Sequence, residues 1–369
     1  MSPFVITGYA PDDMFFGREH EFREITEHAA TASYALIGGR RIGKTSILKR
    51  LERVHLPATG FCALYHDCSF TPTQAELVQA VAPDKTWFPE PPANLPASFA
   101  GIIQALPNDK PLVILLDEAD KLIEPDRRAS YPVFDTLRAL ANAGRCRFVL
   151  SGEQALRTEL TNPNSPLYNF ANEILIGRLD FQSVEELVTR PMKQLEIVLE
   201  DEAEMVQCIW DFTSGHPNVI QRLCQRLIVL LNQRGDRRLT LDDVEAVVVD
   251  PDFLRKDFLN IYWERATALE RLCSLVMATD DSVRTLTAVH EALHKRGVEA
   301  TLNEVDDALE RLADLRNILQ RTAEGYEFAV TAFPEIIAKT ARLEDLIALN
   351  RETYQHYGDV EPRSKRGSP

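Results

Sequence analysis

Short apolar runs alternate with stretches of helical periodicity between residues 34 and 176, and this alternation constrains the fold of the 369-residue chain more than any other feature. Strands are expected over residues 34–37, 61–66, 112–116, 147–150 and 174–176. Helices are expected between them, over residues 44–54, 74–82, 97–106, 133–143 and 153–160. Because strands that are separated by helices pair in the same direction, the pattern predicts an α/β domain whose parallel sheet is covered on both faces.

The rest of the chain has a different pattern. Five prolines fall within residues 83–96, which predicts an exposed loop without regular structure. After residue 179 the strands are expected to stop. Helices over residues 184–195, 203–212, 218–232 and 241–249 then predict a small helical domain, followed by a helical connector over residues 251–263.

Residues 266–340 predict a third domain. Two helices, over residues 269–278 and 286–295, precede a longer one over residues 302–318, in which apolar residues recur at helical spacing. Alternating residues before and after a turn predict a hairpin of strands 319–322 and 326–330. Three helices followed by a hairpin is the element order of a winged helix. A last helix is expected over residues 340–354, and the polar residues 361–369 are expected to be disordered.

A glycine-rich segment follows the first expected strand and fits the pattern G-x-x-x-x-G-K-[ST], with the sequence Gly38-Gly39-Arg40-Arg41-Ile42-Gly43-Lys44-Thr45. Glycines let backbone amides turn inward around phosphate oxygens, Lys44 reaches the β- and γ-phosphates, and the Thr45 hydroxyl binds Mg²⁺. The alternative is a glycine-rich turn that carries a lysine by chance. Since the segment has a strand before it and a helix after it, the sequence predicts nucleotide binding here.

Asp117 and Glu118 follow the apolar run of residues 112–116, so they are expected at the carboxyl end of a buried strand, where α/β sheets place their ligands. Asp117 would hold Mg²⁺ through water, and Glu118 would orient and deprotonate the attacking water. An Asp-Glu pair elsewhere is usually solvated charge, but the apolar run before it favours the catalytic interpretation and hence ATP hydrolysis. Ser151, after the next strand, either contacts the γ-phosphate or the attacking water, or caps a helix.

With these residues placed, the sequence resembles the AAA+ and STAND branches of P-loop ATPases, especially the archaeal-type and origin-initiator-like ATPases. Residues 15–21 are similar to a hydrophobic-Gly-Arg-Glu segment that lies against the adenine in relatives. The resemblance implies that Phe16, Gly17 and Arg18 contact the base, whereas the alternative is the start of an N-terminal helix. The glycine loop and the residues after it are similar to the same group, which adds Ser46 to the implied nucleotide contacts.

Three further residues are assigned by this resemblance alone. Gly215-His216-Pro217 is similar to the Gly-x-Pro motif of STAND and initiator lids, so Pro217 is implied on the adenine side, and Arg222 in the next turn as a sensor of the γ-phosphate. The chain lacks the Gly-x-x-Arg pattern frequent in AAA+ relatives, and a helix terminator is the alternative. Arg178 follows the last expected strand, where relatives carry an arginine that senses nucleotide in cis or from a neighbouring subunit. An exposed arginine at a domain junction is its alternative.

The charge balance argues against DNA as the partner. The chain has 41 Lys and Arg against 56 Asp and Glu, a net charge of −15, so bulk electrostatics does not draw it to DNA. Residues 266–340 alone hold 8 basic and 13 acidic residues, which favours a protein contact of the winged helix over DNA readout. If DNA is bound, the better candidates are Arg127, Arg128, Arg145, Arg147, Lys295, Arg296 and Arg321.

The sequence also predicts a soluble, cytoplasmic protein. The longest apolar run, residues 111–116, is far shorter than the about 20 residues that a membrane helix needs. Residues 1–9 lack the basic and then apolar pattern of a secretory signal. The six cysteines show no Cys-x-x-Cys spacing, so zinc is not expected. Because of the short apolar run, a membrane is not expected as a partner either.

Together these features predict an α/β P-loop NTPase core with a parallel sheet, a helical lid and a C-terminal winged helix. The expected divisions are residues 1–178 for the core, 179–250 for the lid, 251–265 for the connector, 266–340 for the winged helix, and 341–369 for a terminal helix and tail. The leading hypothesis is a molecular switch in prokaryotic signalling or defence that uses ATP and Mg²⁺ and couples nucleotide state to a protein partner or to homo-oligomer assembly.

Two other hypotheses stay open. One is an initiator-like or transposition-regulator ATPase that binds DNA. The other is a nucleotide-binding scaffold with negligible turnover, against which the complete set of Lys44, Thr45, Asp117 and Glu118 speaks.

Overall fold

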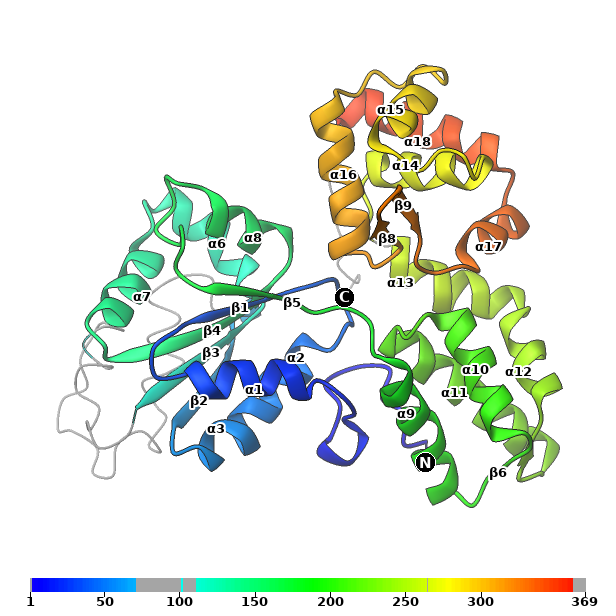
Figure 1. Ribbon diagram of the computed structural model, residues 1–369, viewed down its shortest axis with the longest axis horizontal. Coiled ribbons are helices and arrows are strands. Elements are labelled where there is room, and N and C mark those ends of the chain that lie inside the picture. Colours follow the sequence, from blue (N-terminus) through cyan, green and yellow to red (C-terminus); the bar gives the residue numbers. More distant parts are fainter. Residues whose placement is uncertain (1, 71–100, 102–110, 264, 361–369) are drawn as a thin grey trace.

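A computed structural model describes residues 2–70, 101, 111–263 and 265–360 (Figure 1). The helix expected over residues 74–82, that over 97–106 apart from residue 101, the proline-containing loop 83–96 and the polar tail 361–369 lie outside the described residues. Figure 1 shows three groups of elements: a sheet unit (β1–β5 with its helices), a helical unit (α9–α12) and a C-terminal unit (α14–α18).

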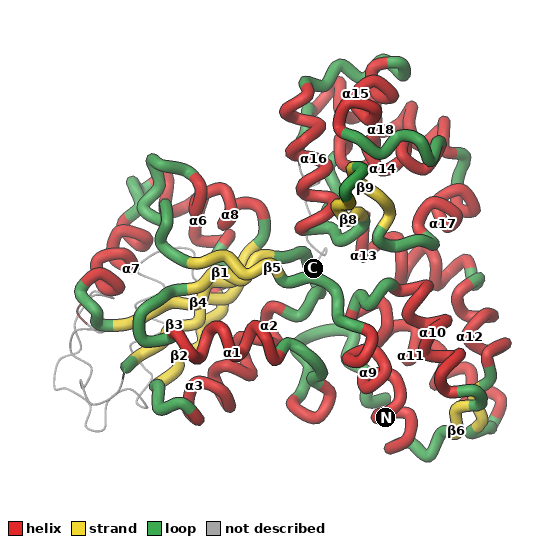
Figure 2. The backbone as a smooth tube through the Cα atoms, in the orientation of Figure 1, coloured by secondary structure: helices red, strands yellow, loops and turns green. Residues whose placement is uncertain are grey.

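The sheet unit is built on five parallel strands in the order β2-β3-β4-β1-β5. Their bounds are β1 (Tyr34–Ile37), β2 (Cys62–Asp67), β3 (Leu112–Asp117), β4 (Cys146–Gly152) and β5 (Asn172–Leu175). Each expected strand is confirmed to within two residues at either end. Figure 2 shows the strands of this unit side by side with helices around them, whereas the other two units are mostly helical.

Helices cover both faces of the sheet, because successive strand residues point to opposite sides. Tyr34 and Leu36 pack with one set of helices, and Ala35 and Ile37 with the other. The first set is α1 (Glu19–His28) and α2 (Lys44–Arg50), and the second is α6 (Asp120–Arg128), α7 (Pro132–Asn142) and α8 (Gln154–Thr161). The predicted α/β class with a doubly covered parallel sheet is therefore confirmed.

Two local expectations in the sheet unit were wrong. The helix expected over residues 44–54 is α-helical only to Arg50 and continues as a π-helical turn, η2 (Leu51–His55), and a short α3 (Leu56–Ala58). Helix α6 was not expected, since it is polar and carries Pro125 in its interior. Its Asp126 carboxylate accepts hydrogen bonds from the N–H groups of Val133 and Phe134, at 2.8 and 2.9 Å, so α6 stabilises the start of α7.

The helical unit contains the four expected helices and one feature that the sequence did not indicate. The helices are α9 (Phe181–Gln194), α10 (Glu202–Thr213), α11 (Pro217–Arg234) and α12 (Leu241–Val248). The expectation that strands stop after residue 179 was wrong, because β6 (Val198–Leu199) and β7 (Arg238–Leu239) pair in parallel. Strands of two residues are too short to show an alternating pattern.

The connector and the C-terminal unit follow in chain order. The connector is a π-helical segment, η5 (Phe253–Leu259), and α13 (Asn260–Trp263). The C-terminal unit comprises α14 (Ala268–Thr279), α15 (Leu286–His294), α16 (Leu302–Asp314), β8 (Leu319–Thr322), β9 (Gly325–Phe328), α17 (Phe333–Thr340) and α18 (Leu343–Tyr357). Helix α16 ends earlier than expected because Asn317 adopts a left-handed φ of 55° before β8. The helix expected over residues 340–354 is α18, which begins three residues later, whereas α17, which ends before the extended Ala341, was not expected.

The helical and C-terminal units share one continuous apolar core. Aromatic side chains of the connector join them: Tyr262 lies 5.1 Å from Phe258 and 5.9 Å from Phe333 between ring centroids. The sheet unit has two separate cores, one on each face of the sheet. None of the helices in the described part of the chain is long and apolar enough to cross a membrane.

Candidate nucleotide-binding site

The glycine loop joins strand β1, which lies between β4 and β5 in the sheet, to helix α2. Gly38 leaves the strand so close to the backbone of Ile176 that a Cβ on Gly38 would lie 2.6 Å from its carbonyl oxygen. Gly43 has a left-handed φ of 107°, a conformation that glycine adopts without a steric cost, and the chain turns there into α2. The buried Lys44 amino group donates to the carbonyl oxygens of Gly38 and Gly39, at 2.6 and 2.8 Å, so the cation lies over the loop.

Asp117 ends the buried strand β3 and accepts hydrogen bonds on both carboxylate oxygens. The hydroxyls of Thr45 and Tyr65 donate to Oδ2 at 2.7 and 2.9 Å. The backbone N–H of Glu118 donates to Oδ1 at 3.0 Å, and the Ser151 hydroxyl donates to the same oxygen. The loop threonine and the strand-end aspartate, far apart in sequence, are therefore neighbours, as the two motifs predict.

Glu118 follows Asp117 with a left-handed φ of 52°, which turns its side chain away from the strand. Burial raises the pKa of the Glu118 carboxyl above its usual range, the nearby Asp117 and Glu153 carboxylates raise it further, and the Lys44 ammonium opposes the rise. A carboxylate with a raised pKa binds a proton more readily, which suits a general base.

A cleft of about 610 Å³ opens beside these groups. Arg40, Arg41, Lys44, Thr45 and Glu118 line it. Residues 5–10 line it as well, together with a set of apolar residues. These are Met14, Phe15, Phe16, Leu179, Leu187 and Pro217. The cleft is thus lined by both charged and apolar residues.

The other expected nucleotide contacts are distributed unevenly around the cleft. Ile42 and Ser46 also line it, and the Ser46 hydroxyl accepts a hydrogen bond from the N–H of Ala10 at 2.9 Å. Arg18 lines it as well, and its guanidinium donates to the carbonyl oxygen of Gly177 at 2.5 Å. Gly17 lies against α9 instead, since a Cβ there would lie 2.4 Å from the Ser183 hydroxyl oxygen.

Three expected contacts, Ser151, Arg178 and Arg222, do not line the cleft. Ser151 is fully buried and its hydroxyl donates to Asp117, so it neither reaches the cleft nor caps α8. Arg178 was expected as a nucleotide sensor, but its guanidinium donates to the Ala329 carbonyl oxygen at 3.0 Å and to the Gln320 side chain at 3.2 Å, both in the C-terminal unit.

Arg222 was expected to sense the γ-phosphate, and in this structure it does not line the cleft. Its guanidinium donates to the Asp257 carboxylate at 2.6 Å and to the Asn218 side-chain oxygen at 2.9 Å. Asp257 lies on the connector, where Arg226 also contacts it at 2.8 Å. The sequence carried no sign of this because the acidic partner lies on a different element.

Sequence reasoning missed two parts of the cleft. Tyr65 reaches Asp117 from the edge strand β2, and no motif marks it. Residues 5–10 lie along the cleft because the N–H of Val5 donates to the Gln221 side chain at 2.7 Å, and the Asn218 side chain donates to the Ile6 carbonyl oxygen at 3.2 Å. The available signal was the pair of polar residues Asn218 and Gln221, one helical turn apart on α11. Both are buried, and a buried polar side chain needs a hydrogen-bond partner.

The C-terminal unit touches the glycine loop directly. The Leu315 carbonyl oxygen lies 1.9 Å from the position of a Cβ on Gly39, so only glycine fits there. Arg157 of α8 forms an ion pair with Asp314 at 2.8 Å. A cavity of about 380 Å³ separates the two units beside these contacts, and Glu118 lines both it and the cleft.

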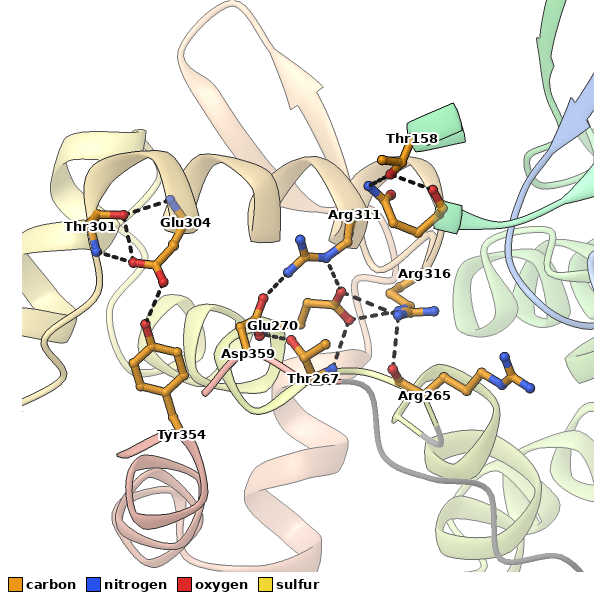
Figure 3. Close-up of polar contacts among 11 residues, drawn as sticks. Thr158, Arg265, Thr267, Glu270, Thr301, Glu304, Arg311, Arg316, Tyr354 and Asp359 are labelled. Carbon is orange, nitrogen blue, oxygen red and sulfur yellow. Dashed lines mark hydrogen bonds and ion pairs between the residues drawn. The ribbon is translucent and has the colours of Figure 1, made fainter. Parts of the chain in front are cut away.

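A buried charge network supports this contact (Figure 3). Glu270, at 0% exposure, accepts hydrogen bonds from the Nε atoms of Arg311 and Arg316, at 2.6 and 2.8 Å. Arg316 also forms an ion pair with Glu153 of the sheet unit at 3.7 Å, and Arg311 one with Asp359 near the C-terminus. Arg316 therefore links the C-terminal unit to the carboxylates around Glu118.

Comparisons with known proteins agree with this geometry. A family model described as an AAA domain matches residues 28–160. No curated protein sequence matches the chain. A Walker-type ATPase of Pyrococcus abyssi superposes with a TM-score of 0.61 at 16% identity, over 91% of this chain and 99% of that one. The ORC2 protein of Aeropyrum pernix, solved in ADPNP–ADP complexes, gives 0.61 at 14% identity, over 96% and 98%. The chain therefore has the fold of P-loop NTPases, with an AAA-type domain.

Proposed function

We propose that this chain is an ATP-binding and ATP-hydrolysing molecular switch of the AAA type. The observation that carries the proposal is that Lys44, Thr45 and Glu118 line one cleft, while Asp117 accepts a hydrogen bond from Thr45 beside it, so that two motifs far apart in sequence meet. The proposed units are those expected from the sequence: a core over residues 1–178, a lid over 179–250, a connector over 251–265 and a winged helix over 266–340. Roles in prokaryotic signalling or defence and a cytoplasmic location stay predictions.

The cleft suits a nucleoside triphosphate. Its volume of about 610 Å³ falls within the range of roughly 300–1,000 Å³ typical of small-molecule sites. Arg40, Arg41 and Lys44 line the cleft and would contact the phosphates, and Phe16 and Pro217 line it too and would contact the base. The similar Aeropyrum pernix protein was solved with nucleotides of this class.

The residues present also fit Mg²⁺. A hydroxyl and a carboxylate are ligands that this hard cation prefers, and those of Thr45 and Asp117 lie 2.7 Å apart. Thr45 would bind the ion directly and Asp117 through water. When bound, the ion supplies positive charge that neutralises the β- and γ-phosphate oxygens.

Glu118 would serve as the general base in hydrolysis. It would accept the proton of the water that attacks the γ-phosphorus, so that ATP and water give ADP and phosphate. The raised pKa of its carboxyl supports this role, because the protonated product of that step is then less costly. Its place between the cleft and the 380 Å³ cavity would let a shift of the C-terminal unit reach the reacting groups.

The first test measures nucleotide binding and turnover in matched variants. Lys44→Ala should lose ATP affinity, and Glu118→Gln should keep affinity but lose turnover by about 100-fold or more. Glu124→Gln, which removes an exposed carboxylate on α6, is the control and should change neither. A Lys44→Ala protein with normal affinity would contradict nucleotide binding at this loop, and normal turnover in Glu118→Gln would contradict the assignment of the base.

The coupling is tested by solution mass and by partner binding. Glu118→Gln protein that grows into a defined oligomer with ATP but not with ADP would support a switch that assembles. A monomer in both conditions would mean that the nucleotide-dependent change is a movement of the core, the lid and the C-terminal unit within one chain. Identical behaviour of the C-terminal unit with ATP, with ADP and without nucleotide, followed by hydrogen exchange, would contradict the switch itself.

Charges in the C-terminal unit support a protein partner over DNA. Arg311 and Arg316, the basic residues at the end of α16, are buried against Glu270. Arg321 in the hairpin is paired with Asp314 and Glu310. The exposed surface of α16 is thus mostly acidic, and we expect no retention on duplex or single-stranded DNA at about 50 mM salt.

A further inference from the structure

Tyr65 lies beside the proposed metal site without belonging to any motif. It sits near the carboxyl end of β2, where it pairs with Leu115 of β3. Two contacts hold it on the α2 side of the sheet. Its N–H donates to a Glu52 carboxylate oxygen at 3.2 Å, and the Lys49 ammonium lies 3.3 Å from the centroid of its ring. Lys49 also forms an ion pair with Glu52 at 3.1 Å, so this lysine supports the ring rather than reaching further into the cleft.

The Tyr65 hydroxyl completes the hydrogen bonds of Asp117. A carboxylate offers about four lone-pair sites. Ser151 and the N–H of Glu118 donate to Oδ1, whereas Thr45 and Tyr65 donate to Oδ2. Asp117 is only 2% exposed, so these four donors, and not solvent, determine how its carboxylate is turned.

The four donors differ in where they lie and in whether they would bind the metal ion themselves. The Ser151 hydroxyl, on β4, and the backbone N–H of Glu118 both donate to Oδ1. Thr45 would itself bind the metal ion, and metal-bound water would then take the place of its hydroxyl on Oδ2. Tyr65 is the one donor to Oδ2, among the described residues, that lines the cleft and is not itself a proposed metal ligand.

We propose that Tyr65 is a positioning residue for the magnesium site: its hydroxyl holds the Asp117 carboxylate in the orientation that accepts a hydrogen bond from metal-bound water. This inference rests on the proposed function and names a residue that the two nucleotide-binding motifs do not contain. Partners that orient metal-binding groups commonly change metal affinity by 10–100-fold when they are removed. Tyr65 should therefore control the affinity for Mg²⁺ and leave that for metal-free nucleotide unchanged.

The test compares Tyr65 with a tyrosine outside the cleft. Tyr65→Phe keeps the ring and removes the hydroxyl that contacts Asp117. Tyr357→Phe is the matched control, since Tyr357 is 69% exposed on α18 and does not line the cleft. The dissociation constant of ADPNP is measured by calorimetry in Mg²⁺ and in EDTA, and the ratio of the two gives the tightening that the metal produces. Thermal unfolding confirms that each variant is folded.

We expect Tyr65→Phe to reduce this tightening about 10-fold, with the EDTA value unchanged, and Tyr357→Phe to change neither value. The Mg²⁺ concentration for half-maximal ATP turnover should rise about 10-fold, while kcat at saturating Mg²⁺ is kept. An unchanged ratio in Tyr65→Phe overturns the inference, and so does equal weakening in Mg²⁺ and EDTA, which would mean that Tyr65 shapes the whole cleft. A wild-type protein that binds ADPNP in neither condition overturns the proposed function as well.

Discussion

The carbonyl oxygen of Leu315 and the α-carbon of Gly39 are in such close contact that a Cβ on Gly39 would lie 1.9 Å from that oxygen. Leu315 follows α16 in the C-terminal unit, and Gly39 is the second residue of the glycine loop. No mobile side chain separates the two backbones, so a shift of either one acts directly on the other. Through this contact, a movement of the C-terminal unit would displace the glycine loop of the nucleotide site.

Gly39→Ala should separate the C-terminal unit from the loop. A Cβ cannot lie that close to a backbone oxygen, so one backbone must move, at a cost of about 1–3 kcal/mol in the free energy of unfolding. Hydrogen exchange should increase over residues 311–317. Gly177→Ala is the matched control, because its Cβ would meet only the Asn317 side chain at an ordinary 3.6 Å. Equal exchange in the two variants would show that the contact does not hold the units together.

Arg316→Met should destabilise the protein by about 3–5 kcal/mol, because it removes one partner of a buried ion pair and leaves Glu270 with a single arginine. Methionine keeps the apolar volume of the side chain. Denaturant unfolding measures the change, with Arg128→Met as the control. The Arg128 side chain is 77% exposed and pairs with Glu124, so its loss should cost less than about 1 kcal/mol. Similar losses in both variants would contradict a structural role of the network.

Lowering the pH should destabilise the fold through His216. This residue is buried against Tyr262, and its Nδ1 atom has no hydrogen-bond partner among the described residues. Burial lowers its pKa to about 3, and the positive charges of Arg178, Arg41 and Arg18 act in the same direction. An unfolded histidine has a pKa of about 6.5. Between these values only the unfolded state binds the proton, so stability is complete above pH 6.5 and falls as the pH is lowered.

The expected slope from His216 is about 1.4 kcal/mol per pH unit below pH 6.5. Carboxylates titrate in the same range, so the measurement is a difference between proteins in urea unfolding from pH 7 to pH 4. His216→Gln should have the shallower dependence. His294→Gln, at a side chain that is 65% exposed, should follow the wild type. A His216→Gln profile parallel to that of the wild type would show that the pKa of His216 is the same in the folded and the unfolded state, which would contradict the prediction.

Arg222→Ala should leave nucleotide affinity unchanged within about twofold and lower the stability by about 2 kcal/mol, because Arg222 is bonded to Asp257 and Asn218. Asp257 keeps its contact with Arg226, which limits the loss. Arg226→Ala removes the other, more exposed arginine from the same carboxylate and serves as the control. A large and selective loss of ATP affinity in Arg222→Ala would instead support the role of γ-phosphate sensor.

Expectations that rest on neighbouring residues agree well with the structure. The strand before the glycine loop and the helix after it are recognisable because the apolar run, the glycines and the helical periodicity are contiguous. Asp117 could be placed beside Thr45 without coordinates, since parallel strands bring their carboxyl ends to one edge of the sheet. Expectations for single side chains, such as Arg178 and Arg222, have less support, because a cation bonds whichever acceptor the packing brings near, and these two bond other parts of the protein here.

The sequence by itself thus determined the α/β class, the glycine loop and the pair of acidic residues at a strand end, all of which follow from local patterns of polarity and conformation. Only the tertiary structure decided that Tyr65 and Ser151 donate to Asp117, that Arg316 bridges Glu270 and Glu153, and that Leu315 lies on Gly39. These contacts join residues far apart in the chain. They depend on how whole elements pack, and the residues themselves carry no periodic or motif signal of their partners.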